Sequence, residues 1–477
     1  MDSFGISSFR YLRLGLIEIL VGAGAAALAQ TPAVPPFSAN DVSWLFPAPA
    51  LAKDFDKLIS MRDLTTPNQQ DPAKRDPVWP DAAFKQFLAI AASPAAQAGG
   101  KQIGLPAEAQ TVDAWFIAGI RIDAGAPGLS NDISGQFGRS PEIRLIIQPV
   151  TRNKDGTPNV LDIAGHLIFD FVMEKKSDPA SGGCFPRPIP DVVAFKAIVA
   201  ELAALRTKLS KGQLGNRVTT FGAPLGVHPG LVDATTANNV RREMKSFLER
   251  HISGRRLDAM AIAGLPAGAH APWIFLSMLK VPPGVVPALP NGGFIPVPGP
   301  TLDGKQFAQM LAPVGTAPPV VPVPNTNNLN PITCRNAAVP AGLPAAERSG
   351  SSTTELFASP APPADKTRQI LDLIADPTKS HFFNTDCVSC HTETRRAMDL
   401  LQLKDIKVVS GIDPAVLPSG DWSVRNFGWA PSGGGKAQAT VTRRTAAETS
   451  AVVTFINSET LTKYTQMVFR YSSSAAF

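Results

Sequence analysis

Hydrophobic residues in the first half of the chain follow the periods of both strands and helices. Segments 114–122 and 143–150 are mostly apolar, and apolar and polar residues alternate over 163–173. All three patterns predict β-strands. Apolar residues recur at helical spacing over 191–209 and 240–252, which predicts two helices. The mixture indicates an α+β domain.

The third of these strands has two different faces. Leu167, Phe169 and Phe171 share one side, and His166 and Asp170 share the other. We expect the second side to face solvent, because two polar residues four apart are too distant along a strand to pair with each other.

Composition changes on both sides of the α+β domain, which we place at residues 81–280. Residues 30–80 are rich in Pro, Ala and polar groups, which predicts an extended arm with one short helix near 52–61. Residues 281–364 carry dense runs of proline, which removes backbone donors and interrupts regular structure. They are predicted to form a connector.

A compact, mainly helical pattern resumes over residues 365–477. One helix is expected around Ile370 and ends before Pro377, another is expected over 392–403, and a last one over 446–457. Thr445 and Glu448 have the spacing of a capping box for the last helix. About 110 residues are enough for a small separate domain.

Length and charge narrow the functional classes. A chain of 477 residues usually forms two or three domains. The formal net charge of +6 is a small excess of 45 basic over 39 acidic residues, without long runs of either sign. Nucleic-acid binding is therefore not expected.

The N-terminus has the features of an export signal. Arg10 and Arg13 precede an apolar stretch, and Ala27-Leu28-Ala29 resembles a cleavage site, so residues 1–29 are predicted to be a signal peptide. No later apolar run is long enough to span a bilayer. The sequence predicts a soluble protein in the periplasm or an equivalent exported location, where disulfides persist.

The most specific motif is Cys387-Val388-Ser389-Cys390-His391. Two thiols one helical turn apart can each bond a vinyl group of one porphyrin, and the adjacent imidazole can then bind the iron, so this spacing is typical of covalent haem attachment. A thioredoxin-like redox pair would need a βαβ context that is absent here. A zinc site would need two more ligands, and a disulfide between residues three apart would constrain little.

Through this motif and the helices predicted around it, residues 365–477 resemble the c-type cytochromes. The resemblance implies a mainly α-helical domain that carries one covalently attached haem c. It also implies that Cys387 and Cys390 are the thioether positions and that His391 is the proximal iron ligand. Domains of this family usually transfer electrons to or from a redox partner, whose identity the sequence does not give.

The second axial ligand of the iron is not evident. Small members of the family take it from the loop before the last helix, but residues 402–445 contain neither Met nor His. Met467 and His381 are the named candidates, and His166, His228 or His270 from the preceding domain is a third choice. This sixth position of the iron can also be vacant or hold water. Its occupancy decides whether the haem acts as an electron carrier or as a catalyst.

Two further sets of residues carry predictions. Trp422, Arg425 and Trp429 lie in an aromatic-rich loop and can supply haem-pocket walls and a propionate donor, although a local aromatic core explains them equally well. Cys184 and Cys334 remain after haem attachment and are predicted to form a disulfide, with two separate buried thiols as the alternative.

The leading hypothesis is an exported electron carrier without bond-making chemistry of its own. One alternative is a haem enzyme or sensor with an open sixth iron position for peroxide or a gas. The other is a binding module in which the haem is a redox-active appendage.

Overall fold

A computed structural model describes most of the chain between residues 36 and 458. The described residues are 36–98, 101–123, 141–176, 187–264, 274–284, 288–297, 309–310, 364–378, 390–391, 393–394, 397, 411–418, 426–431 and 436–458. They belong to one compact unit, Pro36–Phe477.

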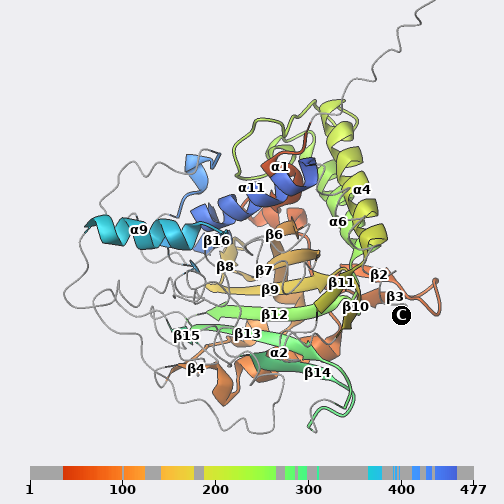
Figure 1. Ribbon diagram of the computed structural model, residues 1–477, viewed down its shortest axis with the longest axis vertical. Coiled ribbons are helices and arrows are strands. Elements are labelled where there is room, and N and C mark those ends of the chain that lie inside the picture. The colour runs from red at the N-terminus through yellow and green to blue at the C-terminus, as the bar shows by residue number, and fades with distance from the viewer. Residues whose placement is uncertain are drawn as a thin grey trace, which may run out of the picture. The chain divides into compact units, whose positions relative to one another are not determined.

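An antiparallel sheet organises this unit (Figure 1). In the described residues the strands follow one another across the sheet in the order β1, β6, β7, β9, β12, β13, β14, with β8 paired to β7 and β15 paired to β13. Their bounds are β1 Ser43–Leu45, β6 Trp115–Asp123, β7 Glu142–Arg152, β8 Pro158–Val160, β9 Ile163–Asp170, β12 Leu257–Gly264, β13 Ile274–Val281, β14 Gly293–Val297 and β15 Gln309–Met310.

Smaller two-stranded sheets surround it. They pair β2 Thr65–Pro67 with β3 Arg75–Pro77, β4 Gln97–Ala98 with β5 Lys101–Gln102, β10 Val172–Lys176 with β11 Arg187–Pro190, and β16 Phe427–Pro431 with β17 Ala437–Val441.

Helices complete the fold. The α-helices are α1 Ala39–Val42, α2 Asp81–Ala91, α4 Val192–Ser210, α5 Pro229–Val232, α6 Ala237–His251, α9 Ala364–Ala375 and α11 Arg443–Asn457. The short 3₁₀ helices are η1 Ala52–Lys57, η2 Pro94–Ala96, η3 Ala107–Gln110, η4 Val112–Ala114 and η7 Pro414–Val416. The mixed α+β class is confirmed.

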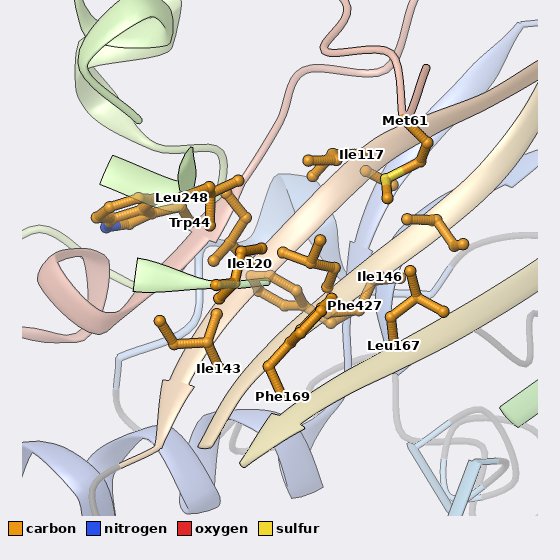
Figure 2. Close-up of a cluster of buried hydrophobic side chains, with 14 of the residues drawn as sticks. Trp44, Met61, Ile117, Ile120, Ile143, Ile146, Leu167, Phe169, Leu248 and Phe427 are labelled. Atoms are coloured by element: carbon orange, nitrogen blue, oxygen red, sulfur yellow. The ribbon is translucent and has the colours of Figure 1, made fainter. Parts of the chain in front are cut away.

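One face of the sheet is the apolar core. Cross-strand pairing places Ile120 opposite Leu145, and Leu145 opposite Leu167, so their side chains share this face. Helix α6 covers it through Phe247, whose ring centroid lies 5.2 Å from that of Trp44 on β1. Figure 2 shows buried side chains from several strands, α6 and β16 in one cluster.

The opposite face is polar near β6 and β7. The register aligns Arg121 with Arg144, Asp123 with Glu142, and Ile146 with His166, so these side chains share a face. Helix α11 covers part of it, and α9 packs against α11 (Figure 1). The expectation that the His166 side faces solvent is wrong near His166, because C-terminal residues pack on it.

Segments predicted as separate units share the core. Trp44 and Met61, in the predicted arm, are almost fully buried, and β1 pairs with β6. Within the predicted connector, β14 and β15 pair with β13. Phe427 and Trp429, from the C-terminal part, belong to the same hydrophobic cluster. These contacts cross the predicted boundaries at 80/81, 280/281 and 364/365, and the division into domains stays a prediction.

Candidate functional site

Part of the cysteine-histidine motif lies in the described residues. Cys390, His391, Glu393, Thr394 and Ala397 have helical backbone conformation, so the helix expected over 392–403 already includes Cys390 and His391. Cys387 lies outside the described residues. The site is therefore built here from Cys390, His391 and their neighbours.

The Cys390 thiol is enclosed although the residue as a whole is partly exposed. The Asn426 Nδ2 donates to its Sγ at 3.9 Å. Burial raises the pKa of the Cys390 thiol to about 11; Arg444 lowers it, and Glu448 and Glu393 raise it further. The group is therefore a neutral thiol at neutral pH.

The His391 ring lies between two aromatic rings of the sheet. Its centroid is 4.9 Å from that of Phe275 on β13 and 6.0 Å from that of His166 on β9. On the strand between them, Ala263 is the partner of Phe275 and Ala261 is the partner of His166. These alanines share a face with the two rings, so the small side chains of β12 leave space between them.

The residues after His391 are fixed to the start of α11. Glu393 is fully buried and accepts from Arg443 Nε at 3.1 Å, from Arg443 Nη2 at 3.0 Å and from the Arg444 backbone N–H at 3.2 Å. The Thr394 hydroxyl accepts from the Arg443 backbone N–H at 2.9 Å. Helix N-termini leave N–H groups without helical partners and favour negative charge, which explains why a carboxylate is buried here.

Helix α9 joins the same assembly. Arg443 Nη1 donates to Asp372 Oδ1 at 2.6 Å, and Arg444 Nη1 donates to the Ile374 carbonyl at 3.0 Å. Two adjacent arginines, Arg443 and Arg444, thus hold together α9, α11 and the helical residues after the motif.

Glu448 connects this assembly to the sheet. Its carboxylate accepts from Arg444 Nε at 2.7 Å and from Arg121 Nη2 at 2.6 Å. Burial alone would raise the pKa of Glu448, but the charges of Arg121, Arg444 and Arg144 lower it to about 2. The carboxylate is therefore ionised, and α11 is anchored to β6.

The polar sheet face retains donors without protein acceptors. The Nε groups of Arg121 and Arg144 are buried and have no hydrogen-bond partner within the part of the chain that the structure describes. Arg144 is the cross-strand partner of Ile168, two residues from His166 on the same face. Arg121 and Arg144 thus share with His166 the polar face of the sheet.

The capping interpretation of Glu448 is wrong. Helix α11 begins at Arg443, and its N-cap is Thr442, whose side chain accepts from the Thr445 N–H. Glu448 therefore lies beyond the first turn, where it pairs with arginines.

Other predicted site residues lie in the core or outside the described residues. Trp429 is fully buried in the hydrophobic core, and its indole N–H donates to the Phe46 carbonyl at 2.9 Å. His228 is buried, and its Nδ1 accepts from the Gly230 N–H at 3.1 Å. The remaining predicted residues lie outside the described residues: His270, His381, Met467, Trp422, Arg425, Cys184 and Cys334.

Sequence reasoning missed Phe275, Asn426 and the ionic residues of the site. Phe275 has the sequence context of an ordinary strand residue, and only the folded structure brings it beside His391. No group of three or more His, Cys, Asp or Glu side chains suited to a metal ion occurs among the described residues. None of the helices described is both long and apolar enough to cross a membrane.

Comparisons with known proteins leave the family open. No protein-family model matches the chain, and neither curated proteins nor solved structures give a match.

Proposed function

We propose that the protein is an exported c-type cytochrome that binds one haem covalently and transfers electrons to or from a redox partner. The proposal rests on the sequence Cys387-Val388-Ser389-Cys390-His391, and the haem would be held by thioethers at Cys387 and Cys390 with His391 on the iron. When bound, the haem supplies reversible one-electron chemistry.

The surroundings of Cys390 fit such a group. Cys390 is followed in the chain by His391, whose ring centroid lies 6.0 Å from that of the His166 imidazole and 4.9 Å from that of the Phe275 ring. The sheet face that carries His166 also carries Arg121 and Arg144, and guanidinium groups are common partners of carboxylates such as those of haem.

The helices around the motif support the expected cytochrome-like domain. Helix α9 precedes the motif, α11 follows it, and the two pack against each other through Arg443 and Arg444. This arrangement fixes Glu393 and Thr394, and with them the orientation of the preceding His391.

Haem attachment is tested by intact mass and by the pyridine haemochrome spectrum of protein coexpressed with cytochrome c maturation proteins. We expect a mass increase of one haem. Cys387→Ala combined with Cys390→Ala should abolish it, whereas the matched control Cys184→Ala should not. A full-length product that acquires no haem under these conditions would refute the proposal.

Electron transfer and export need separate measurements. The haem should be reduced and reoxidised by small mediators, and failure to exchange electrons with any of them would contradict a carrier role. N-terminal sequencing of the exported protein should begin at Gln30, because the signal is predicted to end at Ala29.

A further inference from the structure

A second histidine, His166 on strand β9, lies beside His391. The stretch 402–445, where small c-type cytochromes carry the second iron ligand, has neither Met nor His. His166 on β9 instead brings an imidazole to within 6.0 Å of His391, measured between ring centroids.

We propose that His166 is the second axial ligand of the haem iron, an inference that rests on the proposed function. Since a metal–imidazole bond is about 2 Å and ring atoms lie roughly 1 Å from the centroid, two imidazoles on opposite sides of one ion have centroids about 6 Å apart. The observed separation of 6.0 Å matches this spacing.

The relative orientation of the rings is compatible with this arrangement. Their planes are inclined by 67°. Each axial imidazole plane contains the bond to the iron, so the two planes can be rotated about that axis by any angle.

The sheet holds His166 in place. Strand β9 pairs with β7 on one side and β12 on the other, so the His166 backbone lies inside the sheet. Its partner on β12 is Ala261, whose small side chain leaves space beside the imidazole. On the far side of β12, Phe275 gives the site an aromatic wall.

The ligand pair would come from segments more than 200 residues apart in sequence. The proximal histidine belongs to the attachment motif and the distal one to the central sheet. The α+β part of the chain then has a defined role: it completes the iron coordination. An iron with two protein imidazoles has no open position for peroxide or a gas, which favours the carrier over the enzyme or sensor.

The test uses full-length haem-loaded protein and His166→Ala, with His251→Ala as the matched control. His251 is a histidine on α6 that pairs with Glu201 at 2.5 Å, outside this site. Haem content is measured by mass, and ferric spin state by optical and electron paramagnetic resonance spectra. We expect low-spin wild type and control, and conversion of His166→Ala to high spin, with added imidazole restoring the low-spin spectrum.

A second variant keeps the proposal testable if His166→Ala fails to fold. His166→Met retains a side chain that can bind iron, and it should remain low-spin with the optical signature of a thioether ligand. Haem-loaded His166→Ala that stays low-spin, or haem-loaded wild type that is high-spin, would overturn the assignment while leaving haem attachment intact. Absence of haem from the wild type would overturn both proposals, and the mass spectrum distinguishes this result from the others.

Discussion

Glu448 is an ionised carboxylate in a buried site, where desolvation costs several kcal/mol unless cations compensate it. Arg121 and Arg444 both donate to it within 2.7 Å. Removing one charged partner of such a group leaves the others buried without compensation, and this cost exceeds the net contribution of the ion pair itself.

Glu448→Gln should therefore destabilise the protein by about 3–5 kcal/mol at pH 7. The folded-state pKa of Glu448 is about 2, below the ordinary value of 4.5. Its stabilising contribution is therefore full above pH 4.5 and is lost as pH falls toward 2. Urea unfolding at several pH values should show a difference between wild type and variant that shrinks below pH 4.5.

Glu243→Gln is the control for this substitution. Glu243 pairs with Lys208 at 2.9 Å, but both side chains are about a third or more exposed. An exposed pair contributes less than about 1 kcal/mol, so this variant should unfold nearly as the wild type does. Equal effects of the two substitutions would contradict the importance assigned to the buried network.

Cys390 offers a second measurement at the residue scale. The ordinary thiol pKa is 9.0 and that of Cys390 is about 11, so alkylation of this residue in haem-free folded protein should be about a hundredfold slower than in urea. Peptide mapping after iodoacetamide treatment measures the rate at each pH. The rate should rise about ninefold between pH 9 and 10, whereas a rise of less than about twofold, as for a thiol with the ordinary pKa of 9.0, would show that the thiol is not desolvated.

At the scale of elements, strand β16 packs closely on β6 because Gly119 has no side chain at the point of contact. A Cβ added at Gly119 would lie 2.6 Å from two ring atoms of Phe427, so the aromatic ring occupies the position that a side chain would take. Gln148 completes the contact, because it accepts from the Trp429 N–H at 2.6 Å and donates to the Trp429 carbonyl at 2.7 Å.

Gly119→Ala should destabilise the protein by about 1–3 kcal/mol, because a well-packed core does not accept an extra methyl group without strain. Combining it with Phe427→Leu should cost less than the sum of the single substitutions, since the smaller side chain makes room. Thermal or urea unfolding of the four proteins gives the coupling energy. Additive effects would mean that Phe427 does not occupy the space above Gly119.

Periodicity was sufficient to predict several elements. The segment 191–209 is α4 with Asp191 as its N-cap, and 143–150 is the centre of β7. The local spacing of Glu448 fits a capping box and predicts a cap, yet its partners include Arg121, 327 positions away. A charged residue gives no local sign of a distant partner, so the ionic part of the site could not be predicted from the sequence.

At the scale of the whole molecule, the sequence divides into compositional regions that the core joins together. His391 belongs to a recognisable motif, but nothing in the sequence links it to His166 or Phe275, and only the sheet register together with the C-terminal packing brings the three rings together. Pairing between distant segments depends on the complete set of contacts, whereas helical and strand periods are local. The motif Cys387-Val388-Ser389-Cys390-His391 was recognisable because its spacing is local as well.

The shared core predicts that the C-terminal segment and the sheet unfold as one cooperative unit. Strand β16 and helix α11 bury Phe427, Trp429 and Glu448 against β6 and β7, so neither can detach without exposing apolar surface and unpaired charges. Native-state hydrogen exchange should therefore give the slowest amides of β16 and α11 the same opening free energy, within about 0.5 kcal/mol, as those of β6 and β7. Amides of the partly exposed β2–β3 pair provide the internal control and should exchange through smaller openings. A lower opening free energy for α11 and β16 together, with a weaker urea dependence, would mean that they form an independent domain. The contacts of His391 with β9 and β13 would then join two units that separate before global unfolding.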